Sequence, residues 1–101
     1  MYLVERYWPG VDAALLRAAL PRLERAASAL TEEGRPVAHV GSLLVEDDQV
    51  VFSVIAAGSE SVVAEVNERA ELPVDRIATV TRHGFGQIAT EEEGGNACVD
   101  G

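Results

Sequence analysis

Residues 36–57 read PVAHVGSLLVEDDQVVFSVIAA, and this stretch decides the fold. Two apolar runs, residues 36–45 and 49–57, flank the acidic turn Glu46-Asp47-Asp48. Two such runs around a short polar turn are typical of a β-hairpin. The turn lacks the alternating acidic residues and the glycine of a calcium loop, so we interpret it as a solvated connection.

A helix is predicted on each side of the hairpin. Asp12 is placed to cap the first helix, and Leu and Ala then recur at helical spacing until Gly34. Proline removes one backbone hydrogen bond, so we expect a kink or a brief break at Pro21 inside this helix. Ser59 is placed to cap the second helix, which Leu72-Pro73 ends.

Two outer strands, residues 2–7 and 76–82, complete the pattern. An antiparallel hairpin with right-handed crossovers then gives an α+β, ferredoxin-like βαββαβ sandwich. In this fold a four-stranded antiparallel sheet carries two helices on one face. We expect the domain to span residues 1–83, followed by an acidic, Gly-rich C-terminal extension over residues 84–101.

Composition excludes several kinds of function. The chain has 17 acidic and 8 basic residues, a net charge of −9, and therefore lacks the clustered positive charge that binds nucleic acid or anionic membranes. All eight basic residues are Arg, which excludes lysine Schiff-base chemistry and a phosphate-binding P-loop. Cys98 is the only cysteine, so no intramolecular disulfide forms. With neither a signal-peptide pattern nor a membrane-length apolar run, we expect a cytoplasmic protein.

The two helices cover only one face of the sheet, so we sort the strand residues by alternation. To the helix side we assign Val4, Val40, Leu44, Phe52, Val54, Ala56, Ala78 and Val80. The open face then holds Leu3, Glu5, Tyr7, Val37, His39, Gly41, Leu43, Val45, Val51, Ser53, Ile55, Ile77, Thr79, Thr81 and His83. An apolar face in water is a patch that association covers, so we expect a homodimer or higher oligomer through it. The enclosed polar groups predict a pocket for a small-molecule ligand.

Three of these polar residues are candidates for chemistry. Glu5 is a possible general base or metal ligand, and a salt bridge to an Arg across the sheet or interface is an equal alternative. His39, on an otherwise apolar strand, is a candidate metal ligand or proton carrier, although such a histidine often only hydrogen-bonds a backbone carbonyl. His83 ends the last strand and is the third candidate ligand.

Two functions and a third, structural alternative stay open at this point. The first is a non-enzymatic protein in which Glu5, His39 and His83 bind nickel or another divalent transition metal. The second is a small cofactor-independent enzyme of the dimeric α/β-barrel type, an isomerase or cyclase with Glu5 or His39 as acid or base. The third is an interaction module without chemistry.

Several short motifs, spread over residues 1–82, resemble a known family. They are Val4-Glu5-Arg6, Pro9-Gly10, Gly41-Ser42, Asp47-Asp48, Ile55-Ala56-Ala57 and Leu72-Pro73-Val74-Asp75-Arg76-Ile77. In order and spacing they are similar to a family of small bacterial ferredoxin-like proteins formerly of unknown function, some of whose members are labelled nickel-binding proteins. The resemblance implies the same fold, oligomers and nickel as a ligand.

Overall fold

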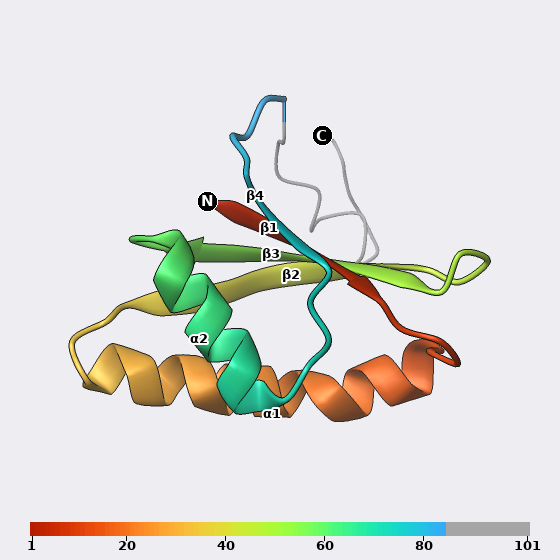
Figure 1. Ribbon diagram of the computed structural model, residues 1–101, viewed down its shortest axis with the longest axis horizontal. Helices are drawn as coiled ribbons and strands as arrows, with labels where there is room; N and C mark the ends of the chain where they lie inside the picture. The colour runs from red at the N-terminus through yellow and green to blue at the C-terminus, as the bar shows by residue number, and fades with distance from the viewer. Residues whose placement is uncertain (85–101) are drawn as a thin grey trace, which may run out of the picture.

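A computed structural model describes residues 1–84 and has the element order that the sequence predicts. The elements are β1 (Tyr2–Tyr7), α1 (Ala13–Glu32), β2 (Val37–Val45), β3 (Val50–Ala57), α2 (Glu60–Ala70) and β4 (Arg76–Thr79). The four strands form one antiparallel sheet in the order β2-β3-β1-β4. Both helices lie on the same face of this sheet (Figure 1). The ferredoxin-like prediction is confirmed.

Helix α1 begins where the sequence predicts. The Asp12 carboxylate accepts a hydrogen bond from the Leu15 amide at 2.8 Å, and the apolar stripe, which includes Leu16, Leu23 and Leu30, is buried. The helix continues through Pro21 without interruption, so the expected brief break is wrong. Burial of one whole face stabilises α1 more than the single lost hydrogen bond destabilises it.

The chain after α2 turns sharply into β4. Glu71 adopts a left-handed conformation with φ of 58°, and Pro73 prevents the helix from continuing. Strand β4 ends at Thr79, whereas the sequence predicted residue 82. Its partner β1 begins at Tyr2, directly opposite Thr79, and beyond it only the Val80 amide continues the pairing, by donating to the Met1 carbonyl at 2.9 Å.

The assignment of faces is confirmed for β1 and wrong for β3. Val4 is fully buried against the helices. In the observed register Val4 lies opposite Ser53, so Val51, Ser53 and Ile55 are the inward residues of β3. Phe52, Val54 and Ala56 therefore lie on the open face. Both faces of β3 carry apolar side chains, so side-chain alternation alone could not show which face packs against the helices.

A β-bulge in β2 changes which residues face inward. His39 pairs with Ile55 and Gly41 with Val54, so Val40 is an extra residue in the strand. Before the bulge Val37 and His39 face the helices, contrary to the prediction. After it Leu44 faces them, while Leu43 and Val45 lie on the open face, as expected.

Two further assignments need correction or fall outside the structure. The predicted faces of β4 are wrong: Ile77, predicted on the open face, packs against the core because its register partner is Val4, and Ala78, predicted on the helix side, lies on the open face opposite Leu3. Apart from Gly84, the predicted C-terminal extension with Cys98 lies outside the described residues. No helix in residues 1–84 is long and apolar enough to cross a membrane.

Candidate functional site

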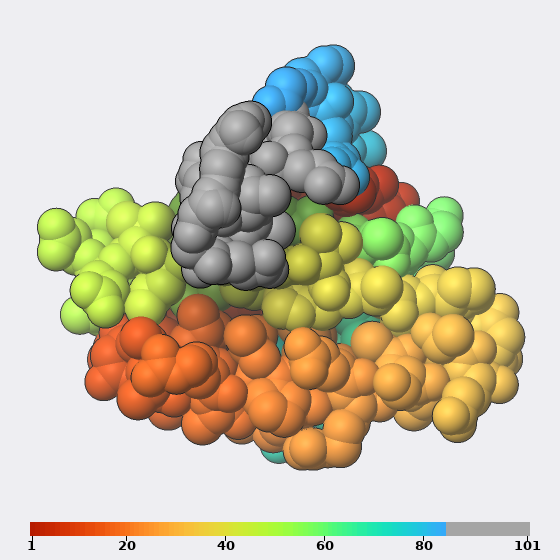
Figure 2. All heavy atoms as spheres, turned by 180° about the vertical axis from the view of Figure 1, so that it is seen from behind, coloured from red at the N-terminus to blue at the C-terminus, as the bar shows by residue number. Residues whose placement is uncertain are grey.

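A groove of about 440 Å³ runs along the edge of the molecule between α1 and β2. Figure 2 looks onto this side, where β2 in yellow runs above α1 in orange. Glu24, Ser28 and Glu32 line the groove from α1, where spacing by four residues places them in one row. His39 lines it from β2. The groove lining thus contains two carboxylates and an imidazole.

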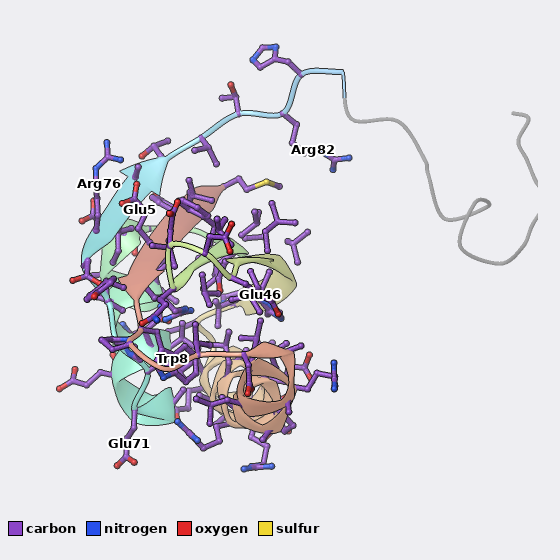
Figure 3. All side chains as sticks on the ribbon, turned by 90° about the vertical axis from the view of Figure 1, so that its right-hand side faces the viewer. Glu5, Trp8, Glu46, Glu71, Arg76 and Arg82 are labelled. Atoms are coloured by element: carbon purple, nitrogen blue, oxygen red, sulfur yellow. The ribbon has the colours of Figure 1, made fainter. Side chains whose placement is uncertain are left out.

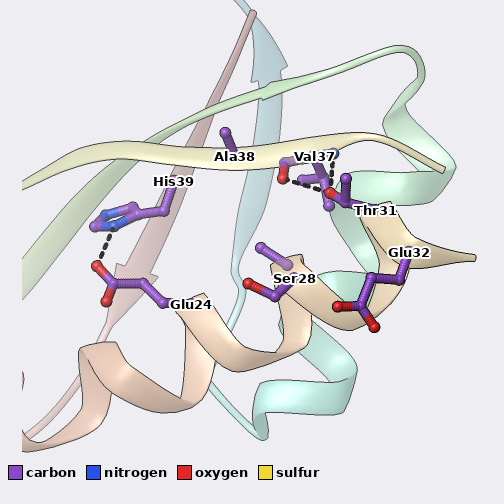
Figure 4. A pocket seen from close by; sticks show the side chains of 8 residues that line it. Glu24, Ser28, Thr31, Glu32, Val37, Ala38 and His39 are labelled. Carbon is purple, nitrogen blue, oxygen red and sulfur yellow. Dashed lines mark hydrogen bonds and ion pairs between the residues drawn. The ribbon is translucent and has the colours of Figure 1, made fainter. Parts of the chain in front are cut away.

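His39 is the residue that connects the groove with the interior. Its side chain is only 7% exposed, and its Nδ1 lies 3.7 Å from Glu24 Oε2 across the groove (Figure 4). Burial lowers the pKa of His39 below its ordinary value of 6.5, and the Glu24 carboxylate opposes that shift. We therefore treat the imidazole as neutral near pH 7. A neutral imidazole is the form that binds metal ions.

The other ring nitrogen of His39 begins a line of polar contacts. Nε2 is hydrogen-bonded to Ser42 Oγ at 2.8 Å, and Ser42 Oγ to Ser53 Oγ at 2.7 Å. Ser53 Oγ in turn accepts a hydrogen bond from Arg6 Nε at 3.2 Å. The line crosses three neighbouring strands on their helix-facing side, from β2 through β3 to β1.

Arg6 is a buried cation at the inner end of this line. It is 1% exposed, and no carboxylate within residues 1–84 forms a salt bridge with it. Its Nη1 donates to the Pro73 carbonyl at 3.0 Å, and its Nη2 has no partner in the described part of the chain. Burial lowers the pKa of Arg6 to about 10, which corresponds to about 3 kcal/mol against the charged form.

Glu5 lies on the opposite face of the sheet from His39. Its carboxylate forms a salt bridge with Arg76 of the neighbouring strand β4, with Oε2 3.1 Å from Nη1 (Figure 3). This is the cross-sheet ion pair that the sequence allowed as the alternative to a functional Glu5. The structure therefore does not bring Glu5 and His39 together as a metal-binding or acid–base pair.

His83 is also separate from this line. It is exposed beyond the end of β4, and its Nε2 is hydrogen-bonded to Thr81 Oγ1 at 2.7 Å. Within residues 1–84 no group of three or more His, Cys, Asp or Glu side chains is placed to hold a metal ion. Of the three candidates from sequence, only His39 lines the groove.

Sequence reasoning placed Ser53 on the same face as His39 but missed the other residues that surround His39. Ser42 and Ser53 each interrupt an apolar strand, and a polar residue at such a position is a usable signal of a buried hydrogen bond. Arg6 gave no such signal, because arginine is normally exposed and Arg6 stands beside the oppositely charged Glu5. Glu24 is one of several exposed acidic residues on α1, and only the fold brings it to the edge strand.

Comparison with known proteins gives two matches. Residues 2–80 match the family described as nickel responsive protein SCO4226-like. The crystal structure of SCO4226 from Streptomyces coelicolor A3(2) has a TM-score of 0.65 and 20% identity, with 82% of this chain and 98% of that chain covered. At this identity the likeness shows the fold. No curated protein matches the chain.

Proposed function

This chain belongs to the nickel-responsive, SCO4226-like family, and from that premise we propose that it binds a divalent transition-metal ion such as nickel in the groove between α1 and β2. One observation carries the proposal: His39 Nδ1 and Glu24 Oε2 lie 3.7 Å apart on facing walls of this groove. A nitrogen and a carboxylate oxygen suit nickel, copper or zinc better than manganese or magnesium.

The surroundings of this pair support the proposal. The groove is lined by Glu24 and Glu32 and by no arginine, so its charge attracts a cation. Glu24 is 63% exposed in its side chain and free to close the short gap toward a bound ion. Ser42 Oγ lies 2.8 Å from the far ring nitrogen and can accept its proton when Nδ1 binds a metal ion, as second-sphere partners of metal-binding histidines do. With two protein ligands, the other coordination positions go to water, and we expect weak, reversible binding.

We further propose that two copies associate through the open face of the sheet. Leu43 and Tyr7 on this face are 68% and 57% exposed. Within residues 1–84 the strands of this face carry one acidic and one basic residue, Glu5 and Arg76, which are paired with each other. It is therefore locally neutral although the chain has a charge of −9, so a second copy meets little repulsion there. In a twofold dimer the Glu5–Arg76 pair is self-complementary.

Calorimetric titration of the untagged full chain with Ni²⁺ tests the metal proposal. We expect stoichiometric binding by the wild-type chain and affinity roughly 10- to 100-fold lower in His39→Gln and Glu24→Gln, because each variant removes one donor. Glu5→Gln and His83→Gln are matched controls that remove the same chemical groups outside the groove. Loss of binding in a control, with His39→Gln unaffected, would place the metal elsewhere and refute the proposal.

A further inference from the structure

The line of hydrogen bonds from Arg6 to His39 contains two serine hydroxyls. Each hydroxyl can point its proton either toward the His39 end or toward the Arg6 end. Arg6 Nε, Ser53 Oγ, Ser42 Oγ and His39 Nε2 follow one another at 3.2, 2.7 and 2.8 Å. Arg6 is 1% exposed and Ser53 is fully buried, so the inner part of this line is closed to solvent. The direction of the hydrogen bonds then depends on the groups at its two ends.

The Arg6 end favours one direction. A guanidinium only donates, so Ser53 Oγ must accept from Arg6 Nε. If Ser53 then donates to Ser42, and Ser42 to His39 Nε2, every proton of the line has an acceptor. In the reverse direction Ser53 Oγ accepts twice, and its own proton has no acceptor among the contacts of residues 1–84. An unmade hydrogen bond at a buried group costs about 1–3 kcal/mol.

The Glu24 end favours the same direction. When Ser42 donates to Nε2, the neutral ring carries its proton on Nδ1, which faces the Glu24 carboxylate at 3.7 Å. A proton there attracts the carboxylate. In the reverse direction a lone pair on Nδ1 would face that negative charge. The two ends of the line thus independently select one arrangement.

We propose that Arg6 is a positioning residue that acts through Ser53 and Ser42 to fix His39 as the tautomer protonated on Nδ1. Its effect on metal binding rests on the proposed function. Coordination through Nδ1 requires this nitrogen to release its proton to water and Nε2 to take one up, so that the ring stays neutral. Both serine hydroxyls must then turn round, and the proton of Ser53 loses its acceptor. In this reversed direction the Ser42 hydroxyl points its proton toward Ser53 and the nearby Arg6 guanidinium, and the positive charge of Arg6 opposes that orientation. Arg6 therefore lowers the metal affinity of the groove.

The ring-nitrogen chemical shifts of the metal-free full chain test this inference. At about pH 8 the imidazole is neutral, and we expect His39 to show a protonated Nδ1 and an unprotonated Nε2. His83, the only other histidine, is exposed and serves as the reference in the same spectrum, assigned with His83→Gln. A wild-type His39 protonated on Nε2 would overturn the inference.

Arg6→Met tests the role of the guanidinium. Replacing a buried, unpaired charge by an apolar side chain of similar length preserves most folds, and we expect the His39 shifts to move toward a mixture of tautomers. Ser53→Ala breaks the same line one residue further on and gives the same result should Arg6→Met fail to fold. Arg22→Met is the matched control, because Arg22 donates to the carbonyls of Ala70 and Glu71 outside the line. An unchanged tautomer in both Arg6→Met and Ser53→Ala would overturn the inference.

Nickel titration of Arg6→Met links the tautomer to the proposed function. We expect a several-fold tighter affinity than in the wild-type chain and no change in Arg22→Met. Weaker or unchanged nickel affinity in Arg6→Met would overturn the inference that Arg6 lowers the metal affinity of the groove. Absence of nickel binding by every variant would refute the proposed function, and the shifts of the metal-free chain would still decide the tautomer.

Discussion

At the scale of single residues, Arg6 and His39 place two basic side chains in the interior of an acidic protein. Burial disfavours the charged form of both, and it lowers both pKa values. Arg6 retains its charge at neutral pH because its pKa is still about 10. His39 becomes neutral and remains available as a ligand. Arg6 thus stays a charged hydrogen-bond donor at neutral pH, whereas His39 is an imidazole whose protonation changes with pH.

The neutral state of His39 predicts how stability depends on pH. The pKa of His39 is lowered below 6.5 in the folded chain, mainly by burial, so the unfolded chain binds the proton more readily. Its contribution to stability is complete above about pH 6.5 and is lost as the pH falls through the folded pKa. The neighbouring charges, Glu24 and Arg6, act in opposite directions and leave burial as the larger effect.

Urea unfolding of the metal-free chain, followed by Trp8 fluorescence between roughly pH 8 and pH 5, measures this contribution. The difference in unfolding free energy between the wild-type chain and His39→Gln should be constant at the alkaline end and shrink on acidification. Carboxylates with lowered pKa values, such as Glu33 and Glu65, lose their contribution at lower pH in both proteins and cancel in the difference. A difference that grows on acidification would contradict the prediction.

At the scale of elements, the end of α2 contains a strained residue. Glu71 adopts φ of 58° at the left-handed position where glycine is preferred. Its side chain points away from the domain in Figure 3 and forms no hydrogen bond or ion pair within residues 1–84. We expect Glu71→Gly to raise the unfolding free energy by about 0.5–1 kcal/mol, because a glycine lacks the steric cost of this conformation.

Thermal or urea unfolding of Glu71→Gly checks this gain. Glu71→Ala is the control, since alanine also removes the charge but keeps the Cβ atom that causes the strain. Equal stabilisation by Ala and Gly would show that the charge, and not the backbone conformation, determines the effect. The Arg22 contact with the Glu71 carbonyl is retained in both variants.

The elements themselves could be predicted from sequence, because each carries a strong local signal. Asp12, the apolar stripe of α1 and the turn at Glu46-Asp47-Asp48 fix the element order. The faces of β2 and β3 were not predicted correctly, since both faces of β3 carry apolar side chains and Gly41, the local signal of the bulge at Val40, was not interpreted as one. His39 was therefore found as a candidate but placed on the wrong face, and its partner Glu24 was not found.

At the scale of the whole molecule, the proposed association through the open face of the sheet can be tested. Sedimentation of the wild-type chain should show a dimer or higher oligomer. Leu43→Glu places a charge on the open face at the edge strand β2, in place of a large exposed apolar side chain, and costs about 2 kcal/mol per copy. Because a twofold interface contains the substitution twice, we expect roughly 1000-fold weaker association.

Leu15→Glu is the control for this experiment. Leu15 is 42% exposed but lies on α1, on the helix-covered side of the sheet. It should leave the oligomeric state unchanged. A wild-type chain that sediments as a monomer would refute association through the open face, and a monomeric Leu15→Glu would move the interface to the helices.

One extra residue at the Val40 bulge determines which side chains of β2 face the helices and which lie on the open face. Upstream of it the strand presents His39 inward to the groove, and downstream it presents Leu43 and Val45 on the open face. Deleting one residue at the bulge would turn the side chains of β2 to the opposite face, either upstream or downstream of the bulge. A substitution can therefore change the groove or the open face separately, whereas a change in the length of β2 turns a whole set of its side chains to the opposite face.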